Sequence, residues 1–253
     1  MAKKHLGQNF LFDTSILGEI VEASGITPND TVVEVGPGLG TLTKLLAGRA
    51  KKVITIELDH ELCLRLLPEL KTFRNIDLIE GDAMKYRYED IGRFSVVANI
   101  PYYITTPLIF RLLETKQNLE SMTLTIQKEV AERIVAAPGG KDYGVLSIML
   151  QYYTLPEMKF MIPKESFHPV PKVDSAVVHI RTRDMPAVRV KDEALFIKLV
   201  KTSFMQRRKT LSNSLKPFGP GIKDILKNTG IDPQRRPETL SMEDFAEIAN
   251  LLE

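Results

Sequence analysis

The sequence predicts an α/β protein with a doubly wound, mostly parallel sheet of seven strands, followed by a small all-helical domain. Short runs rich in Val, Ile and Thr alternate with helical patterns between residues 31 and 126. Such alternation is typical of a parallel sheet with right-handed crossovers. After residue 185 the pattern becomes wholly helical and basic. We therefore predict a first domain of residues 1–185 and a helical domain of residues 186–253.

Seven segments have the composition of strands, and they span residues 31–36, 52–59, 76–83, 94–101, 122–127, 157–163 and 175–183. Apolar residues at helical spacing indicate helices at residues 14–25, 39–50, 60–71, 127–138 and 143–154. The last two strands are joined by the proline-rich segment KESFHPVPKVD. We expect those two strands to form an antiparallel hairpin at the edge of the sheet.

The overall composition is that of a globular protein, with 43% hydrophobic and 26% charged residues among 253. The sequence contains no run of about 18 apolar residues, so it predicts no membrane span. Gln8, Asn9 and Asp13 interrupt the apolar residues near the start, which argues against a secretory signal. The single cysteine, Cys63, rules out an internal disulfide and suits a reducing cytoplasm. We therefore expect a cytoplasmic protein. The four histidines show no metal-ligand spacing, so we also expect no metal.

Charge is distributed unevenly along the chain. Residues 198–236 contain ten Lys or Arg residues against two Asp residues, a formal charge of +8, whereas the whole chain carries +2. Segregated positive charge indicates a polyanionic partner. The alternative is an ordinary solvated face of a helix.

The first candidate site lies at the end of the first predicted strand, in VVEVGPGLGTLT. Gly36 and Gly38 allow a sharp turn and a close approach of a ligand to the backbone. Glu57 follows Gly36 by 21 positions, at the end of the second strand, where a carboxylate can accept both hydroxyls of a ribose. Together these residues predict a site for a nucleotide-like cofactor, although a tight turn and a surface acid would give the same pattern.

The ends of the neighbouring strands favour S-adenosylmethionine over NAD. Asp82 ends the third strand in EGDA and is suited to accept from an adenine amino group. The amino-acid part of the cofactor needs polar partners, and Gln8 and Asn9 are candidates. The same residues are equally consistent with a turn that leads into the helix at residues 14–25.

The second candidate site is NIPYY, directly after the apolar run FSVVA. An exocyclic amine of adenine is a poor nucleophile because its lone pair is delocalised into the ring. The side-chain oxygen of Asn99 and the carbonyl of Ile100 can accept its two N–H bonds, and Pro101 holds both acceptors in place. Tyr102 can stack on a base that has left its neighbours. If the cofactor is a methyl sulfonium, the motif is therefore suited to methyl transfer to adenine by positioning and electrostatics, with no general base.

The motifs together resemble the ribosomal RNA adenine N6-dimethyltransferases: KKHLGQNFL, EVGPGLGTLT, IELD, EGDA, ANIPYYITTP, FHPVPKVDSAV and QRRKTLSNSL. The resemblance covers nearly the whole chain and implies the class I methyltransferase fold, with S-adenosyl-L-methionine as cofactor and S-adenosyl-L-homocysteine as product. It also implies dimethylation of two adjacent adenines in the 3′-terminal hairpin of small-subunit (16S) rRNA. The expected enzyme is a monomer that acts on a pre-30S particle during ribosome biogenesis.

The resemblance assigns roles to single residues. It places the cofactor against Asn9, Leu11, Gly36, Glu57, Asp82 and Asn99. Phe167 resembles the aromatic residue that sandwiches the target base opposite Tyr102, although packing of the edge hairpin is the simpler interpretation of this phenylalanine. Ile100 stands where the small-subunit enzymes usually have leucine. Isoleucine is common there in macrolide-resistance methylases, but the contact comes from the backbone carbonyl.

The basic cluster Arg207, Arg208 and Lys209 lies between two helical patterns and is expected to contact rRNA phosphates. Ion pairs with acids on neighbouring helices are the alternative. For the whole chain, three alternatives remain open: a large-subunit rRNA methylase of the resistance type, a non-catalytic assembly factor, and an NAD-dependent oxidoreductase.

Overall fold

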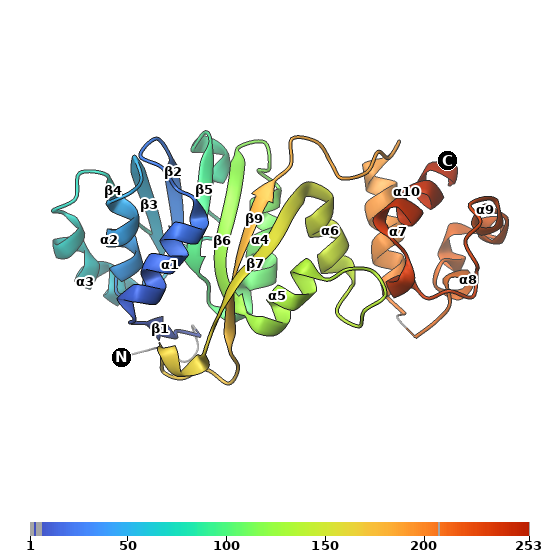
Figure 1. Cartoon of the computed structure of the whole chain (residues 1–253). Helices are drawn as coiled ribbons and strands as arrows, with labels where there is room; N and C mark the ends of the chain where they lie inside the picture. The colour runs from blue at the N-terminus through green and yellow to red at the C-terminus, as the bar shows by residue number, and fades with distance from the viewer. Residues whose placement is uncertain (1–2, 4–6, 207, 253) are drawn as a thin grey trace. The chain divides into compact units, whose positions relative to one another are not determined.

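The computed structural model describes residue 3, residues 7–206 and residues 208–252. Its main sheet has seven strands in the order β4-β3-β2-β5-β6-β9-β7, and β1 and β8 form a separate two-stranded sheet (Figure 1). The strands are β1 (Phe10–Leu11), β2 (Thr31–Val35), β3 (Lys52–Glu57), β4 (Ile76–Glu80), β5 (Phe94–Asn99), β6 (Leu119–Gln127), β7 (Thr154–Ile162), β8 (Phe167–His168) and β9 (Ser175–Thr182).

The pairing confirms the predicted doubly wound, mostly parallel sheet. β2 pairs in parallel with β3 on one side and with β5 on the other, so the order of the strands reverses at β2. β3–β4 and β5–β6 are also parallel, whereas β9 runs antiparallel to β6. β7 and β9 are neighbours at the edge of the sheet, where the last two strands were expected. In open α/β sheets, ligands bind beyond the carboxyl ends of the strands at such a reversal.

Helices follow the strands as the alternation predicts. They are α1 (Thr14–Ser24), α2 (Thr41–Ala47), α3 (His60–Leu70), α4 (Thr105–Leu113), α5 (Lys128–Val135), α6 (Val145–Tyr153), α7 (Glu193–Phe204), α8 (Leu211–Ser214), α9 (Ile222–Asn228) and α10 (Met242–Leu251). Short 3-10 turns are η2 (Tyr88–Asp90), η3 (Tyr102–Ile104), η4 (Lys164–Ser166), η5 (Lys216–Phe218) and η6 (Pro237–Thr239). Figure 1 shows α1 and α2 in front of the sheet and α4 behind it.

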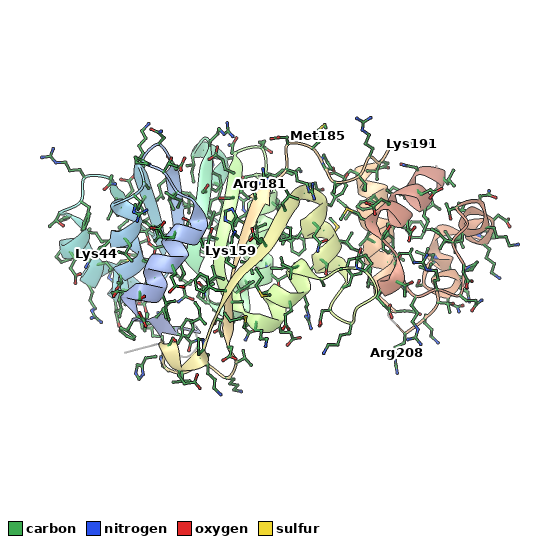
Figure 2. The ribbon with its side chains drawn as sticks, viewed as in Figure 1. Lys44, Lys159, Arg181, Met185, Lys191 and Arg208 are labelled. Atoms are coloured by element: carbon green, nitrogen blue, oxygen red, sulfur yellow. The ribbon has the colours of Figure 1, made fainter. Side chains whose placement is uncertain are left out.

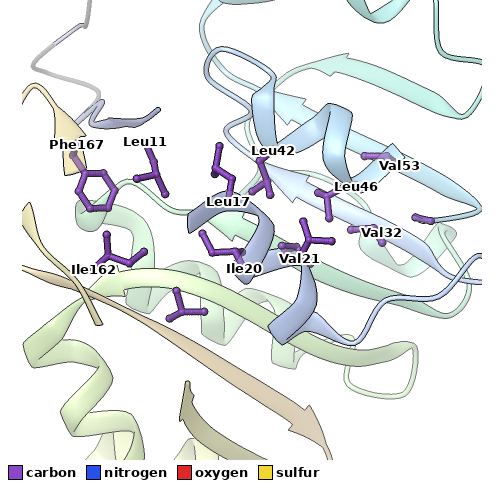
Figure 3. Packing of buried hydrophobic residues seen from close by; sticks show 13 residues of the cluster. Leu11, Leu17, Ile20, Val21, Val32, Leu42, Leu46, Val53, Ile162 and Phe167 are labelled. Atoms are coloured by element: carbon purple, nitrogen blue, oxygen red, sulfur yellow. The ribbon is translucent and has the colours of Figure 1, made fainter. Parts of the chain in front are cut away.

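The hydrophobic core on the α1 side connects the sheet with the β1–β8 pair. Leu17, Ile20 and Val21 on one face of α1 pack over the strands and against α2, as Figure 3 shows. Asp13 caps α1 by accepting from the backbone N–H groups of Ser15 and Ile16, which fixes where the helix begins. The chain segment before α1 is therefore held close to the ends of the strands.

The chain divides into two compact units, which are residues 1–131 with 157–182 and residues 132–156 with 183–253. This division differs from the predicted domains, because residues 132–156 belong with the carboxy-terminal helices. The apolar pattern of α6 predicts a helix but does not specify which surface covers it. In the structure, Tyr152 of α6 packs on Phe196 of α7, with 4.9 Å between the ring centroids. The assignment of the two units to cofactor and RNA stays a prediction.

The second unit has an aromatic core of its own. Phe204 lies 6.4 Å from Tyr143 and 6.1 Å from Phe245, measured between ring centroids. Ser241 and Asp244 form a capping box that begins α10. Among the helices that the structure describes, none is both long enough and apolar enough to cross a membrane.

Candidate active site

One pocket lies beyond the carboxyl ends of β2 to β5, entirely within the first unit. Its lining includes every residue that the sequence predicted for the cofactor, namely Gln8, Asn9, Leu11, Gly36, Gly38, Glu57, Asp82 and Asn99. Ile100, Pro101 and Tyr102 line it as well. The structure thus brings these residues together, while their individual roles stay predictions.

The glycine loop after β2 forms one wall of the pocket. Gly36 and Gly38 have φ angles of +71° and +58°, which side-chain-bearing residues rarely adopt. A Cβ at Gly38 would lie 2.9 Å from Cδ1 of Phe10, and a Cβ at Gly36 would lie 3.9 Å from Cδ of Pro101. Both glycines are therefore required by conformation, and Gly38 also by the close approach of a ring.

Glu57 ends β3 with its side chain almost completely buried. Its carboxylate accepts from the backbone N–H of Asp59 at 2.8 Å and of Gly38 at 3.4 Å. Burial raises the pKa of Glu57, although the two backbone hydrogen bonds oppose the shift. Each carboxylate oxygen retains acceptor capacity, so Glu57 is fixed in position and can still accept from a ligand.

Asp59 lies two residues after Glu57 and connects the amino-terminal segment to the pocket. Its carboxylate accepts from Lys3 Nζ at 2.7 Å and from Gln8 Nε2 at 3.2 Å. Burial alone would raise the pKa of Asp59, but the hydrogen bonds from Lys3, Gln8 and the Glu61 backbone lower it. Gln8 therefore has a structural partner in Asp59 in addition to its place in the pocket lining.

Glu34 is a second buried acid at the pocket, on β2 and two residues before Gly36. Its Oε2 accepts from the hydroxyls of Thr43 at 2.6 Å and Thr55 at 3.0 Å. Burial raises the pKa of Glu34 to about 7. Sequence reasoning assigned no role to Glu34 or Asp59. The sequence offers a signal for both residues. Glu34 lies inside the apolar run VVEV and Asp59 ends IELD, and an acid in such a position is costly to bury unless it has hydrogen-bond partners.

Asp82 is partly exposed where the chain leaves β4. Its Oδ1 accepts from the backbone N–H of Met84 at 2.9 Å, and its Oδ2 lies 3.9 Å from Lys85 Nζ. Oδ2 of Asp82 thus keeps its capacity to accept a hydrogen bond. Its position beside Glu57 agrees with the predicted order of strand-end acids, because β3 and β4 are adjacent and parallel.

Asn99 is the last residue of β5, and its side chain is oriented by the amino-terminal segment. Its Nδ2 donates to the carbonyl of Asn9 at 3.3 Å, and Oδ1 accepts from no other described residue. The backbone N–H of Ile100 donates to the carbonyl of Thr125 on β6 at 3.2 Å. The sheet therefore fixes the backbone on which both predicted acceptors depend.

The two aromatic residues predicted to hold the target base lie in different environments. Tyr102 lines the pocket, is half-buried, and shares a hydrogen bond of 2.8 Å with the hydroxyl of Ser175. Phe167 is only 2% exposed, does not line the pocket, and packs with Leu11 and Ile162 in the core (Figure 3). β1 and β8 pair at this point, which brings Leu11 opposite Phe167. Base stacking by Phe167 stays a prediction and requires the ring to leave this packing.

The predicted RNA-binding cluster lies between α7 and α8. Arg208 and Lys209 are exposed, and neither has an ion-pair partner among the residues that the structure describes. Figure 2 shows Arg208 pointing away from the ribbon. Arg207, the third residue of the predicted cluster, lies outside the described residues. Arg235 differs, because it donates to Thr239 and lies 3.5 Å from Asp244.

A family model described as Ribosomal RNA adenine dimethylase matches residues 1–253. The chain belongs to this family. Two relatives are named Ribosomal RNA small subunit methyltransferase A. The one from Clostridium botulinum (strain Okra / Type B1) is 46% identical, with 98% of this chain and 93% of the relative covered. The one from Caldanaerobacter subterraneus subsp. tengcongensis is 47% identical, with 99% and 97% covered.

Solved structures agree with this membership of the ribosomal RNA adenine dimethylase family. A dimethyladenosine transferase from Plasmodium falciparum matches with a TM-score of 0.83 and 28% identity, covering 94% of this chain and 95% of that one. The 23S rRNA methyltransferase ErmE matches with a TM-score of 0.78 and 28% identity, covering 96% and 99%. The chain is thus an rRNA adenine dimethyltransferase, and both the predicted fold and the predicted family are confirmed.

Ribosomal RNA adenine dimethylases belong to the S-adenosylmethionine-dependent methyltransferases, and the pocket suits that cofactor. Gly36 lines the pocket without a side chain, and Pro101 Cδ, at 3.9 Å, is the one atom within 4 Å of its Cβ position among the described residues other than its chain neighbours. Glu57 and Asp82 offer acceptors at adjacent strand ends. The described residues contain no group of three His, Cys, Asp or Glu side chains arranged to hold a metal ion.

Proposed function

We propose that this protein dimethylates N6 of two adjacent adenosines in the 3′-terminal hairpin of small-subunit (16S) rRNA, on a precursor of the small subunit. The observation that supports the substrate most directly is the full-length similarity of 46–47% to proteins named Ribosomal RNA small subunit methyltransferase A. Supporting geometry comes from Asn99, whose free Oδ1 lies at the pocket that the cofactor acids also line.

The cofactor, when bound, supplies an electrophilic methyl group on a sulfonium. Glu57 accepts from the two hydroxyls of its ribose, and Asp82 accepts from the amino group of its adenine. Gly36 and Gly38 let the backbone come close to it. Asn9 and Leu11, on the segment held by Asn99 and β8, also line the pocket. These residues bind and orient, and no proton is exchanged with them.

The target adenine is positioned by the NIPYY segment. Its N6 amine donates to Oδ1 of Asn99 and to the carbonyl of Ile100, which favours pyramidal nitrogen and frees the lone pair for attack. The bound cofactor would supply the methyl group to this nitrogen, and the displaced proton would leave to water. Pro101 fixes the turn that presents both acceptors, and Tyr102, anchored by Ser175, borders the site. A second cycle on the same nitrogen completes dimethylation.

A large-subunit rRNA target is the second candidate, favoured by the TM-score of 0.78 with ErmE and by Ile100 in the motif. The test is methyl transfer from labelled S-adenosylmethionine to unmethylated small subunits and, separately, to large subunits. We expect N6,N6-dimethyladenosine in the small-subunit rRNA only. Label in large subunits alone would replace the proposal with the second candidate. Tight particle binding without transfer to either subunit would indicate a non-catalytic assembly factor.

A further inference from the structure

Tyr103 is the last residue of the NIPYY segment, and the proposed function so far gives it no role. At 55% it is the most exposed Phe or Tyr residue in the described part of the chain, although it lines the pocket. Exposing an aromatic ring beside a pocket leaves apolar area in water that a ligand can cover. Its neighbour Tyr102, in contrast, is half-buried and hydrogen-bonded to Ser175.

The position of the Tyr103 ring is set by its surroundings on one side only. Gly7, with a φ angle of +60°, lies so close that a Cβ there would be 3.2 Å from Cδ1 of Tyr103 and 3.8 Å from Cβ of Pro101. The backbone N–H of Ile104 donates to the carbonyl of Pro101 at 3.1 Å, which closes the turn that carries the ring. Within the described residues, the Tyr103 hydroxyl has no hydrogen-bond partner. The ring is thus supported at one edge and open elsewhere.

We propose that Tyr103 stacks on a base of the substrate RNA that adjoins the target adenine. This inference rests on the proposed function and adds a positioning residue to it. The RNA is favoured over the cofactor as the partner, because Glu57 ends β3 and Asp82 follows β4, whereas Tyr103 ends the NIPYY segment after β5, which is proposed to receive the target amine. Phe167 is buried in the core, so it offers no open ring for this contact.

Stacking has a kinetic signature that packing does not share. A single aromatic–base stack corresponds to about a tenfold to hundredfold change in binding. We expect Tyr103→Ala to raise KM for unmethylated small subunits by at least about tenfold, with kcat changed by less than threefold. Tyr103→Phe should stay within about twofold of wild type, because the ring suffices, and Tyr103→Leu should resemble the alanine variant. The affinity for S-adenosylmethionine, measured by calorimetry, should not change.

Two controls separate this inference from its alternatives. Leu64→Ala removes a 57% exposed apolar side chain from α3 and should leave KM for small subunits unchanged. Melting temperatures of the Tyr103 variants test whether the ring has only a structural role, namely packing against Gly7. Equal KM values for the leucine and phenylalanine variants, or a loss confined to cofactor affinity, would overturn the stacking role. If the wild-type enzyme transfers no methyl group to small subunits, the proposed function is wrong. That result is distinguishable from a failure of the stacking role, which appears only in the Tyr103 variants.

Discussion

Charged side chains are held in opposite ways in the two compact units. In the first unit, Glu34, Glu57 and Asp59 are buried and accept hydrogen bonds from fixed partners. In the basic segment after α7, Arg208 and Lys209 are exposed and have no ion-pair partner among the described residues. Buried groups act by geometry and are little screened by salt, whereas exposed cations act through a field that salt weakens. Variants at the pocket should therefore lose function at any salt concentration, whereas variants of the basic segment should show losses that depend on salt.

The largest effect is expected at Asn99. Removing its Oδ1 in Asn99→Ala takes away one of the two acceptors proposed for the target amine, and such groups are each worth about a hundredfold to a thousandfold in rate. We expect single-turnover methyl transfer to fall by about a thousandfold, at low and high salt alike. Cofactor affinity, measured by calorimetry, should fall by less than tenfold. Turnover near that of wild type would show that the amine is activated elsewhere.

Phe167 tests whether a buried aromatic residue of β8 serves packing or recognition of the target base. Since the ring is buried with Leu11 and Ile162, Phe167→Ala should lower the free energy of unfolding by about 3–5 kcal/mol. Phe167→Leu should cost less than about 1.5 kcal/mol and keep turnover within threefold of wild type. Urea denaturation and methyl-transfer assays measure the two effects. A leucine variant of normal stability but tenfold lower turnover would instead support base stacking by Phe167.

Comparing Phe167 with Asn99 also shows which parts of the site can be predicted from the sequence. Strand ends in a parallel sheet meet at one edge, so glycine loop, Glu57, Asp82 and Asn99 were predictable from spacing alone. The side on which an aromatic residue packs depends on pairing between distant segments, here β1 with β8. Periodicity does not contain that information. The same limitation applies to residues 132–156, which the structure groups with the carboxy-terminal helices, since α6 is helical by pattern whichever surface covers it.

Glu34 provides a pH test of the buried charges. Its pKa is raised from 4.5 to about 7 by burial, so the folded state holds a proton that the unfolded state releases between those values. Stability from this group is therefore present at low pH and lost as pH rises through about 7. We expect Glu34→Gln to gain up to about 3 kcal/mol relative to wild type between pH 4.5 and pH 8.

Denaturation of the cofactor-free protein at several pH values measures this change. Glu19→Gln, an exposed acid on α1, serves as the matched control and should show no such trend. A difference between Glu34→Gln and wild type that does not vary with pH would mean that Glu34 stays ionised when buried.

Glu57→Ala should weaken binding of S-adenosylmethionine by about tenfold to a hundredfold. Hydrogen bonds to a charged acceptor are each worth about 1.5–3 kcal/mol at most, and part of this is lost to solvent exchange. Glu80→Ala is the control, because Glu80 ends the adjacent strand, bonds to His60 and does not line the pocket. Calorimetry compares the two variants at matched folded fractions. Unchanged affinity in Glu57→Ala would remove this acid from the cofactor site.

The smallest effect, and the one most sensitive to salt, is expected in the basic segment. Replacing Arg207, Arg208 and Lys209 together with alanine removes three cations that we predict to contact rRNA phosphates. Each lost contact lowers the salt slope of binding by about 0.9, so the logarithmic slope should fall by up to about 3. Because Arg208 and Lys209 are exposed, the melting temperature should stay near that of wild type. Arg235→Ala is the informative comparison, since its contacts with Thr239 and Asp244 predict a loss of stability instead. If the triple variant melts earlier while its salt-dependent binding to small subunits is unaltered, the cluster holds the helices together and does not recognise RNA.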